Sequence, residues 1–209
     1  MAGVLEFLVS GIILGLAEGI SPGPLITLII SETLKYGKRE GIKVAVSPLI
    51  TDSAIILLAL FVLSNLAKYS LVIGVISLFG ACYLVYLGLE NIRARTGTSE
   101  VAVSRGGAFK RGIITNLLSP YAYVFWFSIG GPMIFEGLSV SFSAAALFLL
   151  GFYGLLIGSK AAVALIVDKS KSFIKSKYYS YIIRALGVVL ISFAVLFVIE
   201  ALRLMQSSL

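Results

Sequence analysis

The sequence predicts an all-α integral membrane protein with six transmembrane helices, and three features of its 209 residues support this fold class. Of these residues, 59% are hydrophobic and 13% are charged, whereas soluble domains average roughly 45–50% and 25%. The basic residues gather in alternate connecting segments, and a Ser-Pro motif occurs at related positions in the two halves of the chain. Lipid is therefore expected to be the main solvent of this chain.

The apolar residues form long uninterrupted stretches. A helix needs about 20 mainly apolar residues to cross the hydrocarbon core of a bilayer, and six stretches of about this length lie between charged clusters. They run approximately from Val4 to Ile30, Ile42 to Leu63, Leu71 to Leu89, Gly112 to Phe135, Val140 to Val167 and Tyr181 to Leu202. Long runs of this kind favour helices over the alternating strands of a barrel.

Little sequence remains outside these stretches, so we expect one transmembrane domain over residues 1–209 and no soluble domain. The first stretch is expected to be retained and not cleaved as a signal peptide. It lacks a basic leader, carries Glu6, and is longer than the roughly 7–15 residues of a signal-peptide core.

Most of the 17 basic residues lie in the first, third and fifth connecting segments. They are Lys35, Lys38, Arg39 and Lys43, then Arg93, Arg95, Arg105, Lys110 and Arg111, and finally Lys169, Lys171, Lys175, Lys177 and Arg184. The second segment carries Lys68, and the fourth carries no basic residue. This asymmetry predicts a multi-pass protein of the cell membrane with these basic loops in the cytoplasm and both termini outside. Basic loops beside apolar spans indicate anionic lipid as the partner, and no nucleic-acid binding is expected.

The first and fourth apolar stretches share a pattern that indicates an internal repeat. Residues 18–22 read E-G-I-S-P and residues 116–120 read N-L-L-S-P. Because three spans separate the copies, the second copy would enter the membrane from the opposite side. We therefore expect two inverted repeats of three helices, over about 1–93 and about 108–209.

Prolines inside the first and fourth stretches predict broken helices. Each proline removes a backbone donor and clashes with the preceding turn. The candidate binding residues at the first break are Ser21, Pro22, Gly23 and Pro24, and those at the second are Asn116, Ser119 and Pro120. Broken helices expose backbone groups that bind substrates in transporters, although a packing kink is the alternative interpretation.

Glu18, Asp52 and Lys160 are ionisable residues deep within apolar stretches, and each costs about 2.5–3.5 kcal/mol at a helix centre. Asp52 and Lys160 are expected at similar depth, where they could form an ion pair between the second and fifth helices. The alternatives are a purely structural pair or a lysine that reaches toward the cytoplasm. Two carboxylates and one ammonium leave one negative charge, which a proton could neutralise during a transport cycle.

Two further patterns lie on the broken spans. Gly11, Gly15, Gly19 and Gly23 recur every four residues and predict a smooth face for close helix packing. A group of aromatic residues follows the second break and either lines a solute cavity or packs against other helices. These are Tyr121, Tyr123, Phe125, Trp126 and Phe127.

Several function classes are excluded by what the sequence lacks. Cys82 is the only cysteine and there is no histidine, which removes dithiol chemistry and the usual zinc ligand sets. Residues 19–23 match G-x-S-x-G, but no histidine base is available and the motif lies in a membrane helix. There is no phosphate-binding G-x-x-x-x-G-K-[ST] loop. We expect neither an enzyme nor a bound cofactor or metal.

The motifs resemble those of the lysine exporter (LysE) type amino-acid translocator family, and the resemblance covers nearly the whole chain. In the first half it rests on S-P-G-P at residues 21–24, G-K-R-E-G at 37–41, Asp52, and G-A-C-Y-L-V-Y-L-G at 80–88. In the second half it rests on F-K-R-G at 109–112 followed by N-L-L-S-P at 116–120. Pro48, shortly before Asp52, and Ser119 depart from the family pattern.

The resemblance implies six helices in two inverted triplets and export of amino acids or similar metabolites in exchange for protons or cations. The residues by themselves also allow a passive channel or facilitator, or a cation exporter that uses carboxylates. A homodimer through small-residue faces is possible, although one bundle explains the glycine pattern equally well.

Overall fold

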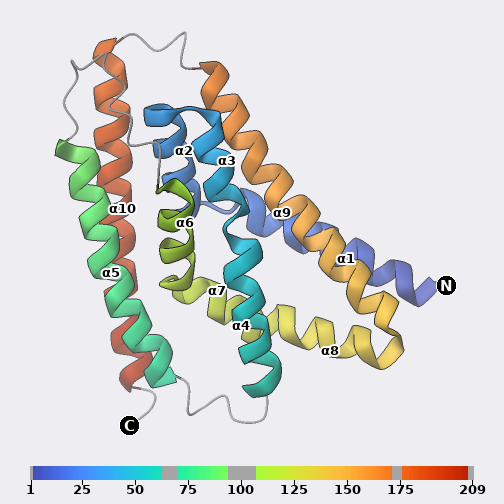
Figure 1. The fold of residues 1–209 in the computed structure, drawn as a ribbon. Coiled ribbons are helices and arrows are strands. Elements are labelled where there is room, and N and C mark those ends of the chain that lie inside the picture. The colour runs from blue at the N-terminus through green and yellow to red at the C-terminus, as the bar shows by residue number, and fades with distance from the viewer. Residues whose placement is uncertain (1, 63–69, 94–106, 171–175, 207–209) are drawn as a thin grey trace.

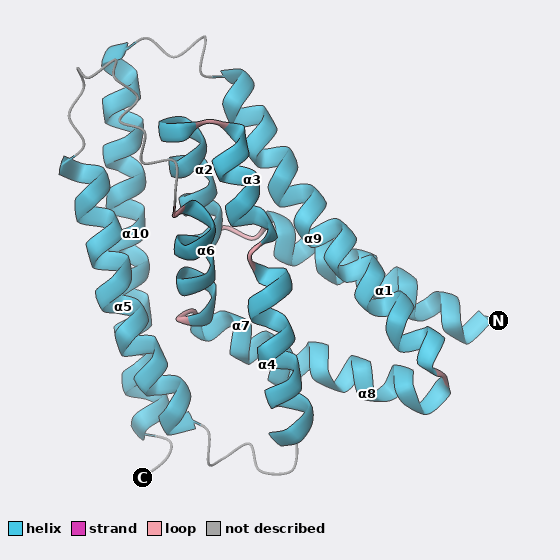
Figure 2. Ribbon diagram, in the orientation of Figure 1, coloured by secondary structure: helices cyan, strands magenta, loops and turns pink. Residues whose placement is uncertain are grey.

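The protein is described by a computed structural model over residues 2–62, 70–93, 107–170 and 176–206. These residues form helices joined by short turns, and no strand occurs among them (Figure 1, Figure 2). The elements are α1 (Ala2–Ile20), α2 (Pro24–Tyr36), α3 (Lys38–Val46), α4 (Pro48–Val62), α5 (Ser70–Arg93), α6 (Ala108–Leu117), α7 (Pro120–Phe125), the π-helix η2 (Trp126–Gly130), α8 (Gly131–Val140), α9 (Phe142–Ser170) and α10 (Ser176–Gln206). The predicted loop residues Lys68, Arg95, Arg105, Lys171 and Lys175 lie outside the described residues.

Several helices are long and apolar enough to cross a membrane. Within the described residues, three meet this condition over Lys38–Ala59, Phe142–Ser170 and Tyr181–Arg203. A fourth span results if the bent pair of α1 and α2 counts as one. Large apolar side chains such as Leu57, Leu150 and Ile166 are exposed on these helices, as expected for surfaces that face lipid. The chain is therefore an all-helical membrane protein.

Both predicted helix breaks are confirmed. The axis bends by 61° between Val4–Ile20 and Pro24–Tyr36, and Pro24 occupies the first turn of α2. The second break separates α6 from α7, where Pro120 occupies the first turn. A proline at this position loses no hydrogen bond, because the first amides of a helix have no partner within it. Each proline therefore starts a new helix and does not kink a continuous one (Figure 2).

The first predicted loop is shorter than expected. Helix α2 continues to Tyr36 and α3 begins at Lys38, so Gly37 alone joins them. Gly37 has a φ of 99°, a conformation that residues with a Cβ rarely adopt. Lys35 and Lys38, predicted as loop residues, therefore sit on helix ends, where long basic side chains reach away from lipid.

The glycine pattern of α1 packs against α9 within the same chain. A Cβ added at Gly11 would meet the carbonyl of Phe148, and one added at Gly15 would meet that of Phe152. The two backbones therefore lie close together along this face, as small residues permit between membrane helices. The fourth glycine of the pattern, Gly23, has open space around it and takes no part.

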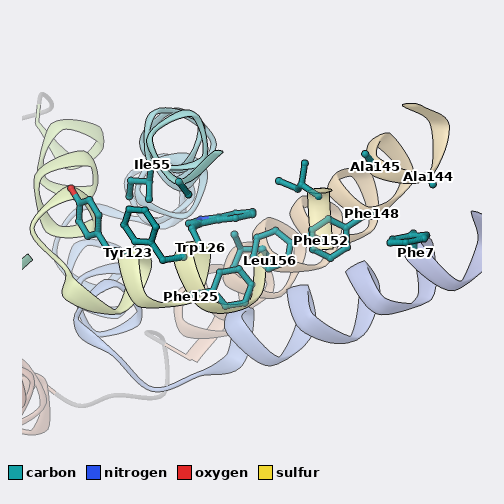
Figure 3. Close-up of a cluster of buried hydrophobic side chains, with 13 residues drawn as sticks. Phe7, Ile55, Tyr123, Phe125, Trp126, Ala144, Ala145, Phe148, Phe152 and Leu156 are labelled. Carbon is teal, nitrogen blue, oxygen red and sulfur yellow. The ribbon is translucent and has the colours of Figure 1, made fainter. Parts of the chain in front are cut away.

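Helices α2, α3, α5, α6 and α10 form a second group beside this pair. Helices α5 and α10 pack along each other, and α2, α3 and α6 lie between them and α9 (Figure 1). One buried apolar cluster joins α2, α3, α5 and α10, and another gathers the aromatic residues of α7, η2 and α9. Figure 3 shows the second cluster, with Trp126 next to Phe125 and Phe152.

Substitution of Gly15 by alanine is expected to destabilise the protein by about 1–3 kcal/mol, because the new methyl group has no room between α1 and α9. The melting temperature of the purified protein in detergent measures this effect. Gly154→Ala is the matched control, since Gly154 lies on α9 and has nothing within 4 Å of its added Cβ. Equal losses in both variants would contradict the close packing of α1 on α9.

Candidate functional site

A cavity of about 200 Å³ lies where the two broken helices meet. Its lining combines residues of both breaks with buried charged residues and an aromatic wall. The lining residues are Glu18, Ser21, Pro22, Gly23, Pro24, Leu25, Ile26, Pro48, Asp52, Thr115, Asn116, Ser119, Tyr121, Ala122, Phe125, Trp126, Phe152, Leu156 and Lys160. Of the predicted site residues, Pro120 alone is absent from the lining, and it forms the start of α7 behind Ser119.

Lys160 of α9 holds the end of α1. Its side-chain nitrogen donates hydrogen bonds to the carbonyl oxygens of Glu18, at 2.8 Å, and Gly19, at 3.3 Å. The last carbonyls of a helix have no partner within it and carry partial negative charge, which a cation stabilises. Lys160 is only 5% exposed, so these hydrogen bonds compensate for the burial of its charge.

Asp52 of α4 is held by the second break. Asn116 of α6 donates from its side-chain amide to Asp52 Oδ1 at 2.7 Å and to the hydroxyl of Thr51 at 2.6 Å. The side chain of Trp126 also interacts with the carboxylate. Asp52 is 5% exposed, and hydrogen bonds to a buried carboxylate offset the loss of its hydration. Asn116 thereby joins the first half of the chain to the second.

The expected direct ion pair between Asp52 and Lys160 does not form. Both line the same cavity, but no salt bridge in the described part of the chain joins them. Each instead has a partner beside a helix break. Lys160 binds the backbone carbonyls at the end of α1, and Asp52 binds the side-chain amide of Asn116 near the end of α6. The spacing argument brought both residues to one cavity, but it did not account for these nearer partners.

The start of α2 faces the cavity. Gly23 precedes the helix in an extended conformation, and no side chain caps the free amides of the first turn. Gly23, Pro24, Leu25 and Ile26 all line the cavity. The N-terminal end of a helix attracts anions, because its amides point outward without partners. The cavity thus combines this electropositive end with the Lys160 ammonium and the carboxylates of Glu18 and Asp52.

The aromatic residues after the second break divide into two groups. Tyr121, Phe125 and Trp126 line the cavity, and Phe152 of α9 completes this wall (Figure 3). The other two predicted residues do not line it. The Tyr123 hydroxyl instead donates a hydrogen bond to the carbonyl oxygen of Leu117, at 2.8 Å. This bond satisfies a backbone acceptor that the helix break leaves without a helical partner.

Sequence reasoning missed seven lining residues. Three of them, Leu25, Ile26 and Ala122, lie within two positions of predicted residues in the sequence. Helical spacing would have found three of the other four. Pro48 precedes Asp52 by four residues, whereas Leu156 and Phe152 precede Lys160 by four and eight, so each lies on the same helix face as the charged residue. The fourth is Thr115, next to Asn116. Its hydroxyl is buried and has no hydrogen-bond partner in the described structure.

Comparison with known proteins identifies the family. The model of the LysE type translocators matches residues 17–201, which include every lining residue of the cavity. The chain belongs to this family. LysE translocators carry solutes across membranes and are not enzymes, and the apolar helices described above agree with this membership.

Three proteins with sequences similar to this chain have names that refer to chemotaxis or efflux. The chemotactic transduction protein ChpE of Pseudomonas aeruginosa is 28% identical over 62% of this chain and 66% of its own length. A leucine efflux protein of Salmonella typhimurium is 29% identical over 51% of this chain and 53% of its own length. A putative amino acid efflux protein of Bacillus subtilis, YcgF, is 26% identical over 62% of this chain and 65% of its own length.

The similarity to these relatives is partial. The chain spans between about half and just under two thirds of the length of the curated relatives it matches. No solved structure matches the chain significantly.

Replacement of Lys160 by methionine, which has similar length and no charge, is expected to lower stability by about 1–3 kcal/mol, because the carbonyls of Glu18 and Gly19 lose their donor. Thermal unfolding in detergent measures the loss. Lys110→Met removes an exposed lysine of α6 and is expected to leave the melting temperature nearly unchanged. An unchanged melting temperature for Lys160→Met would show that the ammonium does not stabilise the end of α1.

Proposed function

We propose that this LysE family member is a secondary transporter that exports amino acids or related small metabolites, coupled to protons or cations. The observation that carries the proposal is the cavity at the two helix breaks, which holds buried groups of both charge signs. Membership of a translocator family supports transport, and two relatives named for efflux support amino acids and outward movement.

The chemistry of the cavity suits a small zwitterion. Asp52 and Glu18 supply carboxylates for a substrate ammonium group, while Lys160 and the start of α2 offer positive charge for a substrate carboxylate. An ammonium group has three donors, and Lys160 directs two of them to the carbonyls of Glu18 and Gly19. One donor therefore remains for a substrate.

The same groups support coupling to a cation. With all three ionised, two carboxylates and one ammonium leave one net negative charge in the cavity. A bound zwitterion does not change this balance, so a proton or another monovalent cation would neutralise the loaded site. Movement of the neutral loaded site across a low-dielectric region costs less than movement of a charged one, which would link substrate flux to the cation gradient.

We also propose that the chain crosses the membrane six times as two inverted repeats, over about 1–93 and about 108–209. Two observations support this plan. Each proposed repeat has a break in its first span, after α1 and after α6, and each ends with a long helix, α5 or α10. The Lys and Arg residues of the basic loops support a cytoplasmic position for their end of the bundle, with both termini outside.

The transport proposal predicts gradient-dependent efflux of at least one labelled amino acid from proteoliposomes with an imposed pH difference. Asp52→Asn and Lys160→Ala are expected to reduce this efflux at least roughly tenfold, since each removes a charged group of the cavity. Glu136→Gln, an exposed carboxylate of α8, is the matched control and should retain full activity. If no amino acid moves, the substrate class is wrong.

The coupling proposal predicts that Glu18→Gln or Asp52→Asn abolishes the stimulation of efflux by the pH gradient. The physical reason is that an amide keeps the shape of the carboxyl group but cannot take up a proton. Efflux is measured with and without the gradient, with Glu136→Gln as the control. Stimulation that persists in both cavity variants would exclude these carboxylates as coupling groups, and wild-type flux that ignores the gradient would indicate a passive facilitator.

A further inference from the structure

A cluster of four charged residues lies away from the cavity and is not used by the proposed transport site. We call Glu32 and Lys35 of α2, Glu90 of α5 and Arg111 of α6 the inner charge cluster. Arg111 donates from one guanidinium nitrogen to Glu32, at 3.2 Å, and to Glu90, at 2.9 Å. Lys35 lies 3.6 Å from Glu90. These contacts connect α2 to the consecutive helices α5 and α6.

The cluster is largely buried and electrically balanced. The side chain of Glu32 is 3% exposed and that of Lys35 11%, while those of Glu90 and Arg111 are about one quarter exposed. Two positive and two negative groups leave no net charge, and Lys35 also donates to the side chain of Asn91, at 2.6 Å. Separating such groups without new partners is costly, whereas water entering between them replaces the lost interactions.

Three of the four cluster residues lie on α2 and α6, two helices whose other ends line the cavity. Along α2, Glu32 follows Pro24 by eight residues, about 12 Å along the helix axis. Along α6, Arg111 precedes Asn116 by five residues, about 7.5 Å along the axis. Pro24 and Asn116 line the cavity. Both helices continue from the cavity to the same end of the molecule (Figure 1), so the cluster lies on the side of the cavity that faces this end.

We propose that the inner charge cluster is a gate that closes the cytoplasmic route to the cavity. This inference rests on the proposed transport function and on the cytoplasmic position of the basic loops. Glu32, Lys35 and Glu90 belong to the first half of the chain, whereas Arg111 belongs to the second. A movement of the two halves that admits a solute from the cytoplasm separates Arg111 from both carboxylates, and its reversal restores them.

Ion pairs suit this task better than apolar contacts. Apolar side chains in a membrane gain little by associating, because lipid tails surround them equally well. A salt-bridge cluster is stable while dry, and water can replace its contacts when the two halves part. The gate therefore has two states, closed by direct ion pairs or open with hydrated charges.

Accessibility of the cavity to a thiol reagent tests the gate without any substrate. Cys82 is exposed, so Cys82→Ser provides the background into which Ala122→Cys, in the cavity lining, is introduced. A membrane-impermeant maleimide is then applied to inside-out and to right-side-out vesicles. Arg111→Gln is expected to raise the labelling rate from the cytoplasmic side roughly tenfold. Such a change corresponds to a loss of about 1.4 kcal/mol in the stability of the closed state relative to the open state.

A second variant and a matched control keep the test decisive. Glu90→Gln removes the charge that pairs with Arg111 and Lys35 but leaves the contact of Arg111 with Glu32. It is therefore also expected to raise the cytoplasmic labelling rate, but by less than Arg111→Gln. Lys43→Gln is the control, because Lys43 pairs with Glu40 within α3, at 2.6 Å, and no ion pair within the described residues joins it to another helix. Gel filtration and melting temperature in detergent confirm that each variant folds.

The possible outcomes separate the gate from the transport proposal. Increased cytoplasmic labelling in Arg111→Gln and Glu90→Gln, with Lys43→Gln unchanged, supports the gate even if no amino acid is transported. Labelling that stays at the wild-type rate in a folded Arg111→Gln or Glu90→Gln protein overturns it. An equal increase in Lys43→Gln also overturns it, because the effect would then come from charge loss at that end of the bundle.

Discussion

Backbone groups freed inside the membrane must find hydrogen-bond partners, and the architecture of this protein depends on how that requirement is met. At the end of α1 the carbonyl oxygens of Glu18 and Gly19 accept hydrogen bonds from the ammonium of Lys160. Loss of this contact would leave buried polar groups unsatisfied, at the cost of about 1–3 kcal/mol given above for Lys160→Met. The buried lysine is therefore explained first by the broken helix, and it leaves one donor for other chemistry.

This contact also determines how α1 and α9 approach each other. Lys160 can reach the end of α1 only if the two helices pack closely, and glycines at Gly11 and Gly15 remove the side chains that would prevent it. The aromatic residue Phe152 of α9 lines the same cavity as Lys160 and packs against Trp126, which follows the second break. Close backbone packing and cavity lining are thus two results of the same arrangement.

Helix α6 connects the polar contacts of the two halves. At one end Asn116 binds Thr51 and Asp52 of α4, and at the other Arg111 binds Glu32 and Glu90. Polar contacts hold helices together in a membrane where apolar contacts alone discriminate poorly. They can also be exchanged for water, so a short helix held at both ends by such contacts is well suited to move between two positions.

The sequence by itself determined the membrane class, the two breaks and most of the cavity residues, because prolines and charges within apolar stretches have large local free-energy costs that are visible without a structure. Only the tertiary structure decided which groups meet. The sequence allowed an ion pair between Asp52 and Lys160, yet Lys160 binds backbone carbonyls freed by the first break, and Asp52 binds the side-chain amide of Asn116 beside the second. The inner charge cluster was likewise hidden among residues assigned to loops or loop ends. Contacts between helices depend on how far each helix extends and on its rotation, and residue spacing along one chain does not specify either.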